Sequence, residues 1–155
     1  MPIEVGAEAP DFTLKNQDDE DWTLSAHRGR TVVLLWYPLD WSPTCTTESC
    51  SVTADLERFA SQDAVVVGIS RDSTWSHKAF KDHHKIGYDL LADPMLEVTK
   101  LYGLEHPKVP FISHRATVIV DKDGKVGFVQ VQENTPEARD LAAVEEALGA
   151  VAAAG

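Results

Sequence analysis

Two cysteines, Cys45 and Cys50, lie five residues apart shortly after the apolar run Val-Val-Leu-Leu-Trp-Tyr of residues 32–37. Six consecutive apolar residues favour a buried strand. Ser42 and Pro43 are typical of a helix start, because serine is a preferred N-cap and proline suits the first helical position. Cys45 is then the third helical residue, where open amide N–H groups and the helix dipole favour an anion. A thiol held there should ionise more readily than a free one.

The residues next to Cys45 could complete a reactive site. The open N–H groups of the helix start could hold the oxygens of a small substrate. Ser42 could cap the helix or hydrogen-bond the sulfur or a bound oxygen. Trp36, Tyr37 and Trp41 would give the site apolar walls, although simple packing is the favoured interpretation of Trp41.

Two other interpretations of the cysteines have to be weighed. A free cysteine is often an inert, buried small hydrophobe, but a position at a helix start beside proline and hydroxyl residues argues against this. A zinc site is disfavoured, because Cys-x4-Cys is not the usual ligand spacing and the sequence holds no second cysteine pair. The six histidines are scattered, so no metal site is expected.

The spacing of the two thiols constrains what they can do together. Five residues along an ideal helix separate the two Cα atoms by roughly 8–9 Å. A disulfide needs a Cα separation below about 7 Å. Either Cys50 is unrelated to Cys45, or the first helical turns must unwind for the two to bond, and opening near a helix end costs little.

Composition narrows the class of protein. The 155 residues predict a single domain, 1–155, with a net charge of -11, which argues against nucleic acid or an anionic membrane as a partner. No segment approaches the ~20 apolar residues of a membrane span, and the first residues lack the features of a signal peptide. The cytoplasm is therefore the expected location. In a reducing compartment, a close cysteine pair is more often redox-active or metal-binding than structural.

The order of the expected elements predicts an α/β domain. Apolar runs and turn signals predict short strands at 9–14 and 22–24, strands at 32–37 and 64–70, a short strand or bend at 90–94, and a hairpin at 117–120 and 127–131. Helices are expected at 43–60, from 72 or 73 to 84, at 95–102 and at 135–148, with Gly149 ending the last and residues 151–155 a frayed tail. This order favours three layers around a mixed sheet, since the hairpin cannot be parallel.

The segment from Pro38 to Glu48 resembles the active-site motif of the peroxiredoxins, Pro-x-x-x-Thr/Ser-x-x-Cys, which Pro38, Ser42 and Cys45 match. A second cysteine five residues on is similar to the bacterioferritin comigratory protein branch of that family. Residues 6–14, residues 70–73 and the stretch from Arg115 to Gly124 also resemble the family, in the family's order. Each match is weak alone, but the ordered set is specific.

The resemblance implies a thioredoxin-like α/β/α fold and a role for each matching residue. Cys45 would be the peroxidatic nucleophile, and Cys50 would resolve its sulfenic acid. Arg115 would favour the thiolate and hold the peroxide, although a surface salt bridge would explain an arginine there equally well. Ser42, in place of the commoner threonine, would orient the peroxide, and Pro38 would shield the thiolate. Glu48 would steady the arginine, although an acidic residue early in a helix needs no such role.

The function so implied is a thiol-dependent peroxidase without metal or other cofactor. Cys45 would reduce a hydroperoxide, Cys50 would form an intramolecular disulfide with it, and thioredoxin or a similar dithiol would reduce that disulfide. The chain is expected to be a monomer or a homodimer. The alternatives are a disulfide oxidoreductase of the same fold, which would usually carry Cys-x-x-Cys, and a non-enzymatic binding module with sluggish thiols.

Overall fold

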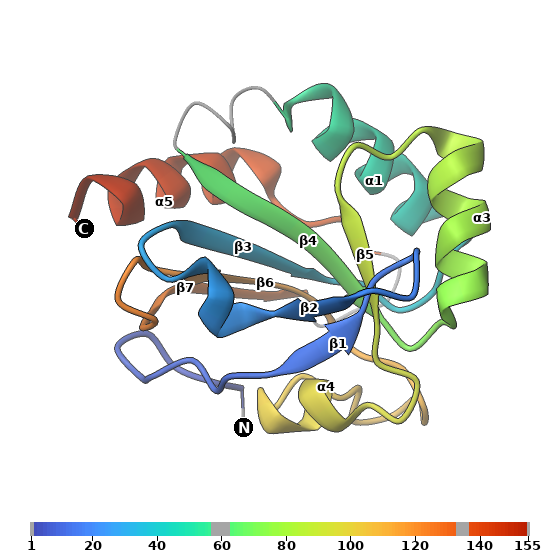
Figure 1. Ribbon diagram of the computed structural model, residues 1–155, viewed down its shortest axis with the longest axis horizontal. Coiled ribbons are helices and arrows are strands. Elements are labelled where there is room, and N and C mark those ends of the chain that lie inside the picture. Colours follow the sequence, from blue (N-terminus) through green and yellow to red (C-terminus); the bar gives the residue numbers. More distant parts are fainter. Residues whose placement is uncertain (1, 57–62, 133–136, 155) are drawn as a thin grey trace.

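One mixed β-sheet with helices on both faces forms the protein (Figure 1). The computed structural model describes residues 2–56, 63–132 and 137–154. Across the sheet the strands follow the order β2-β1-β5-β4-β3-β6-β7. Their bounds are β1 Thr13–Lys15, β2 Asp21–Thr23, β3 Thr31–Trp36, β4 Ala64–Ser70, β5 Asp89–Ala92, β6 Arg115–Val120 and β7 Val126–Gln132. The helices are η1 Leu24–His27, α1 Pro43–Ala54, α3 Thr74–His84, α4 Glu97–Leu101 and α5 Leu141–Ala154.

The middle of the sheet is parallel and its outer parts are antiparallel. β3 pairs in parallel with β4, and β4 with β5, whereas β6 runs antiparallel to β3 and forms a hairpin with β7. The prediction of a mixed sheet is therefore confirmed. The hairpin turn also forms as expected, because Gly124 has the positive φ of 87° that the turn needs and donates its N–H to the carbonyl of Asp121.

The two faces of the sheet bury separate apolar clusters. α1, α3 and α5 cover one face, where Val52, Phe80 and Leu148 pack against inward side chains of the strands. On the other face, Val98 of α4 packs in a cluster with Phe12 and Trp22 from the N-terminal part of the chain. Successive residues of a strand point to opposite faces, so Trp36 belongs to the second cluster while Tyr37 belongs to the first, together with Cys45. The expectation that Trp36 walls the cysteine site is therefore wrong.

The last helix differs most from its expected bounds. α5 begins at Leu141, where the Asp140 carboxylate accepts the Ala143 N–H at 3.0 Å and caps the helix, and not at residue 135. Residues 133–136 lie outside the described residues. α5 then continues through Gly149 to Ala154, so Gly149 does not end it and residues 151–154 of the expected tail are helical. The reason is tertiary: Val151 packs over Gly127 of β7, where a Cβ would lie 2.7 Å from a Val151 methyl group.

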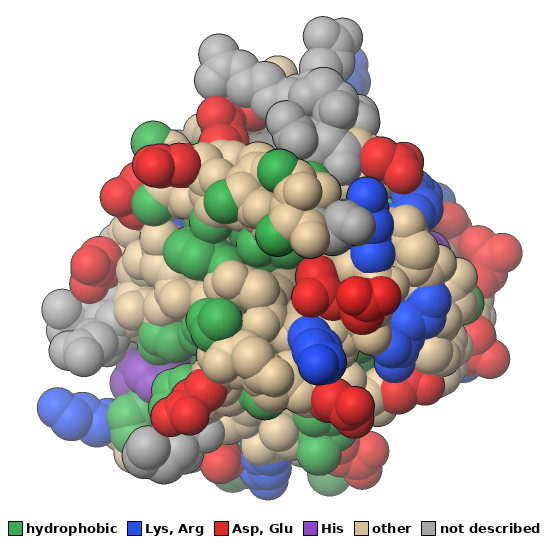
Figure 2. Space-filling view, turned by 90° about the vertical axis from the view of Figure 1, so that its left-hand side faces the viewer, with side chains coloured by type: hydrophobic (Ala, Val, Ile, Leu, Met, Phe, Trp, Pro, Cys, Tyr) green, Lys and Arg blue, Asp and Glu red, His purple; other side chains and the backbone are tan. Residues whose placement is uncertain are grey.

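Two further observations concern the surface and the length of the helices. Acidic side chains are spread over the face in Figure 2, with basic ones among them, rather than gathered into one patch. Within the described residues, no helix combines the length and the apolar character needed to cross a membrane. α1 ends at Ala54, and the expected helical residues 57–60 lie outside the described residues.

Candidate active site

Cys45 sits in the first turn of α1, where the sequence predicts it. Ser42 is the N-cap and Pro43 the first helical residue, and the Ser42 hydroxyl oxygen accepts the Cys45 N–H at 3.3 Å. The Ser42 hydroxyl still has its hydrogen to donate, because it acts as an acceptor in this contact. The Cys45 side chain is buried, with an exposed fraction of 1%. A buried sulfur thus lies at the positive end of a helix dipole and beside a hydroxyl donor.

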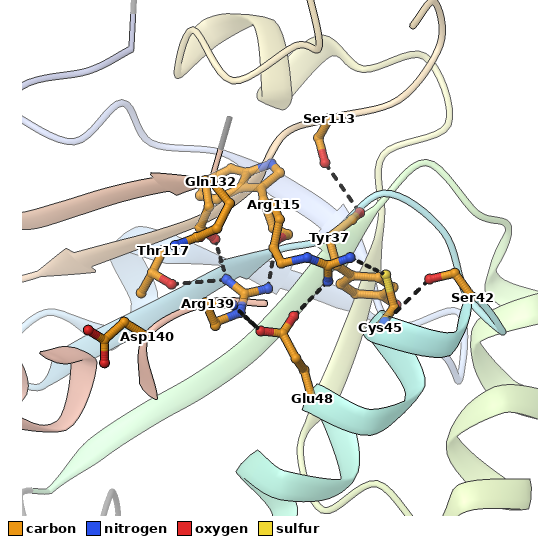
Figure 3. Close-up of polar contacts among 12 residues, drawn as sticks. Tyr37, Ser42, Cys45, Glu48, Ser113, Arg115, Thr117, Gln132, Arg139 and Asp140 are labelled. Carbon is orange, nitrogen blue, oxygen red and sulfur yellow. Dashed lines mark hydrogen bonds and ion pairs between the residues drawn. The ribbon is translucent and has the colours of Figure 1, made fainter. Parts of the chain in front are cut away.

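Arg115 reaches Cys45 from across the sheet. It is the first residue of β6, and β6 is antiparallel to β3, with Ala116 paired to Trp36. The start of β6 therefore lies at the edge of the sheet where β3 ends and the chain turns toward α1. From there Arg115 Nη2 donates to Cys45 Sγ at 3.2 Å (Figure 3). A guanidinium in this position stabilises the thiolate over the thiol through charge and hydrogen bonding.

Glu48 holds the guanidinium in place. It lies three residues after Cys45, so both side chains leave the same face of α1. Its Oε1 accepts from Arg115 Nη1 at 2.6 Å, and only 8% of the Glu48 side chain is exposed. Arg115 thereby makes one charge-assisted bond to the carboxylate and one to the sulfur, which fixes the plane of its guanidinium.

A second arginine, Arg139, also contacts Glu48 and was not predicted as a site residue from the sequence. Its backbone N–H donates to Glu48 Oε2 at 2.6 Å, and its Nε lies 3.4 Å from the same oxygen. Its Nη1 and Nη2 donate to the carbonyls of Ala116 and Trp36, so the side chain ties the segment before α5 to β6 and β3 (Figure 3). Burial lowers the pKa of Arg139, and the Glu48 carboxylate opposes this effect.

One sequence signal could have pointed to Arg139. It is the only Lys or Arg after residue 125, in a segment whose other charged residues are all acidic. The expected helix at 135–148 includes Arg139 but assigns it no partner. Its partners are 91 and 103 residues away, at Glu48 and Trp36.

Three ionisable side chains are buried together beside the sulfur. The side chains of Arg115, Arg139 and Glu48 are at most 8% exposed. Buried charges are stable only when they are paired and hydrogen-bonded, so the contacts of Glu48 with the two arginines depend on one another.

The loop between β3 and α1, residues 37–42, closes the site from one side. Pro38 is buried in this loop, and Tyr37 donates its phenol hydrogen to Asp40 at 2.6 Å. Burial raises the pKa of Tyr37 well above its usual value, so the phenol stays a donor. Trp41, by contrast, is 47% exposed and packs against Phe80 of α3, in line with the packing interpretation.

Cys50 is exposed on α1, and both cysteines are free. Because residues 43–54 form one continuous helix, the two thiols are held at the separation of an intact helix, roughly 8–9 Å between Cα atoms. The structure thus brings Ser42, Glu48 and Arg115 to Cys45 but keeps Cys50 apart. Among the described residues, no group of three or more His, Cys, Asp or Glu side chains could hold a metal ion.

Comparison with known families and proteins gives consistent results. A model described as the AhpC/TSA family matches residues 5–129. Peroxiredoxin Q, chloroplastic, from Suaeda salsa is 37% identical over 135 residues, which are 87% of this chain and 63% of the plant protein. Peroxiredoxin Bcp from Bacillus subtilis (strain 168) is 35% identical over 147 residues, covering 89% of this chain and 94% of the bacterial protein. The chain thus spans less than two thirds of the plant relative.

Solved structures show the same fold. Peroxidoxin BcpB from Mycobacterium tuberculosis matches with a TM-score of 0.83 and 28% identity over 97% of both chains. The reduced 2-Cys peroxiredoxin of Plasmodium vivax matches with a TM-score of 0.87 and 28% identity, over 97% of this chain and 82% of that one. These matches confirm the thioredoxin-like fold that the sequence predicts.

Proposed function

Because the chain belongs to the AhpC/TSA family, we propose that it is a thiol-dependent peroxidase that reduces hydroperoxides at Cys45. The single observation that carries the proposal is the contact at 3.2 Å between Arg115 Nη2 and the buried Cys45 Sγ at the start of a helix. A guanidinium and a helix start are the surroundings in which cysteines become reactive, and the thiolate is the nucleophilic form of cysteine.

In the first step the Cys45 thiolate attacks the terminal oxygen of a hydroperoxide. The sulfur lone pair forms the S–O bond, the O–O bond breaks, and the electron pair leaves on the distal oxygen. Cysteine is thereby oxidised to sulfenic acid, and the leaving oxygen takes a proton to become water or an alcohol. Arg115 and the amide N–H groups of the helix start stabilise the charge that develops on that oxygen. The Ser42 hydroxyl, with its hydrogen available, orients the peroxide, and Pro38 keeps bulk water away.

Oxidation weakens the contact between Cys45 and Arg115. A thiolate accepts a charge-assisted hydrogen bond from the guanidinium, whereas a neutral sulfenic acid accepts a weaker one. Chemistry at the sulfur therefore favours the opening that the helix geometry demands before Cys50 can approach.

In the second step the Cys50 thiol attacks the Cys45 sulfur and forms the disulfide, while the hydroxyl group leaves as water. An external dithiol, thioredoxin or a similar protein, then reduces the disulfide by exchange, and its own two thiols are oxidised. Neither step requires a metal or an organic cofactor. The cytoplasmic location and the 1–155 domain assignment stay predictions.

Two matched cysteine variants test this sequence of steps. Cys45→Ser should consume no peroxide, because the nucleophile is absent. Cys50→Ser should complete one rapid turnover and accumulate a sulfenic acid, detected by mass spectrometry as a dimedone adduct on Cys45. Peroxide consumption by Cys45→Ser at the wild-type rate would refute the proposed nucleophile. Continued cycling of Cys50→Ser with a dithiol at the wild-type rate would refute the resolving role alone.

A further inference from the structure

A second buried polar cluster lies beneath the loop of residues 37–42 and takes no part in the steps above. At its centre Asp40 and His77 meet, with Asp40 Oδ2 2.8 Å from His77 Nδ1 and both side chains 0% exposed. Asp40 comes from the loop itself and His77 from α3. Such a pair is unusual, because ionisable side chains are rarely buried so completely without a structural or functional reason.

Both ring nitrogens of His77 have a hydrogen-bond partner. Its Nε2 lies 3.0 Å from the carbonyl oxygen of Leu91 in β5, and a carbonyl can only accept, so Nε2 carries a hydrogen. Its Nδ1 faces Asp40, whose carboxylate also accepts hydrogen bonds from Tyr37 at 2.6 Å and Ser76 at 2.8 Å. Asp40 thus accepts from two hydroxyl groups and shares a hydrogen with His77 Nδ1, so each polar side-chain atom of the buried pair has a hydrogen-bond partner.

Hydrogen bonds of this pair and of the Asp40 backbone connect the loop to α3, to β5 and to the turn after β4. Tyr37 approaches Asp40 from the end of β3, and the Asp40 N–H donates at 2.7 Å to Asp72, in the turn after β4. Asp72 is itself held by Ser70 at 2.9 Å. Tyr37 and Asp72 are the titratable side chains that hydrogen-bond to the pair's residues within the described structure. Burial raises the pKa of Tyr37, so its phenol stays protonated and donates to Asp40.

The loop has a reason to need such anchoring. Trp41, between Asp40 and Ser42, has a φ of 70°, a left-handed conformation that is unfavourable for a large side chain. Strained backbone of this kind persists only where the surrounding contacts over-determine it. Here the anchored Asp40 precedes the strained residue and the helix cap Ser42 follows it. The direction in which Ser42 leaves the loop therefore depends on where Asp40 is held.

We propose that Asp40 and His77 are positioning residues for peroxide reduction, in which their buried hydrogen-bonded pair holds the loop of residues 37–42 so that Ser42 and Pro38 face Cys45. This role rests on the proposed function. It makes the loop the fixed half of the site, while the first turns of α1 form the half that moves.

The variant Asp40→Asn tests the proposal with little change of shape. Asparagine has a single acceptor oxygen, so it cannot accept from Tyr37 and Ser76 on separate oxygens as Asp40 does, and the anchoring of the loop is weakened. Peroxide reduction by Cys45 should slow by about 10- to 100-fold, the cost of a small misplacement of reacting groups. Alkylation of Cys45 by iodoacetamide, which needs the thiolate but not the peroxide-binding geometry, should stay within about twofold of wild type. Asp82→Asn is the matched control, because it removes an exposed carboxylate from α3, the helix that carries His77. It should change neither rate.

The burial of the pair is measured separately, on the wild-type protein without peroxide. Nitrogen NMR of the imidazole should show a His77 Nε2 hydrogen that exchanges slowly with water, and faster exchange in Asp40→Asn. Exchange of this hydrogen in the wild type at the rate of an exposed histidine, or a folded Asp40→Asn variant that reduces peroxide at the wild-type rate, would overturn the inference. A wild-type protein that does not react with peroxide would overturn the proposed function and the positioning role with it, and this result is distinct from equal rates in the two proteins.

Discussion

Replacing Glu48 by glutamine should weaken the whole site, because one carboxylate serves two buried arginines. Its two oxygens lie 2.6 Å from Arg115 and 3.4 Å from Arg139. Glutamine keeps the shape but has a single acceptor oxygen, so its amide group must face one of the guanidinium groups donor to donor. The variant also removes the carboxylate charge that both buried guanidinium groups contact in the wild-type protein.

The expected cost can be estimated from these contacts. Breaking a buried ion pair by removing one partner costs about 3–5 kcal/mol, and the charge attraction at about 4 Å in a medium of effective dielectric constant 20 has a similar size, about 4 kcal/mol. Because glutamine keeps one hydrogen bond, we expect a loss of about 3 kcal/mol in the free energy of unfolding. At an m-value of about 1–3 kcal/mol/M, the urea midpoint falls by about 1–3 M.

Equilibrium urea unfolding of the reduced protein measures this loss. Glu146→Gln, the same chemical change at an exposed position of α5, is the control and should stay within about 0.5 kcal/mol of wild type. Two kinetic results should accompany the loss of stability. The reaction of Cys45 with peroxide should slow, because Arg115 is no longer oriented, while disulfide formation after oxidation should become faster, because the closed form of α1 is weaker.

Two outcomes would refute the reasoning behind Glu48→Gln. An unfolding free energy within about 0.5 kcal/mol of wild type would mean that the carboxylate does not hold the arginines. The ultraviolet absorbance of the thiolate reports the ionised fraction of Cys45. Removing the negative charge of Glu48, which competes with the sulfur for Arg115, should not lower this fraction. A lower fraction in the variant would therefore contradict the electrostatic argument.

Three further predictions concern the scaffold. Arg139→Lys keeps the charge but cannot donate to all three acceptors of the arginine side chain, so the free energy of unfolding should fall by about 3 kcal/mol in urea; an unchanged midpoint would contradict the anchoring role. All three tyrosines are buried with raised pKa values, that of Tyr88 to about 12, so the unfolded chain ionises first and stability should fall as the pH rises from 10 toward 12, by about 3 kcal/mol for Tyr88 alone. Tyrosinate absorbance should then appear only with unfolding, and its appearance in the folded protein at pH 10 would refute this. Gly149→Ala should raise the thermal midpoint, because alanine is favoured over glycine in a helix by about 1 kcal/mol. Gly127→Ala should lower the midpoint, because the added Cβ would meet Val151. Midpoint shifts in the same direction for both variants would argue against the packing of α5.

The sequence predicted the position of Cys45 well, because the signals for it are local. An apolar run, a serine cap and a proline at the first helical turn act through neighbouring backbone atoms, and α1 begins where they indicate. The hairpin turn at Gly124 was predictable for the same reason. The start of α5 was not, because Thr135-Pro136 offers a plausible local helix start, whereas Asp140 caps the helix that actually forms.

The partners of the buried charges could not be derived from the residues alone. Arg115 was assigned through resemblance to a family, and only the structure shows its contacts with Glu48 and Cys45, 67 and 70 residues away. Arg139 had no such guide. Trp36 and Tyr37 are neighbours in sequence, yet they serve opposite faces of the sheet, so that one lies with Cys45 and the other does not.

The sequence by itself determined where a thiol meets a helix start and that a second thiol on the same helix lies too far away to bond. These features depend on backbone geometry over a few residues, which local side chains dictate. Only the tertiary structure decided which charges share the buried site with Cys45, and that the loop before it is anchored by Asp40 and His77. Such contacts form only when distant segments exclude water together, because an ionisable group is stable in the interior only beside partners that the fold supplies.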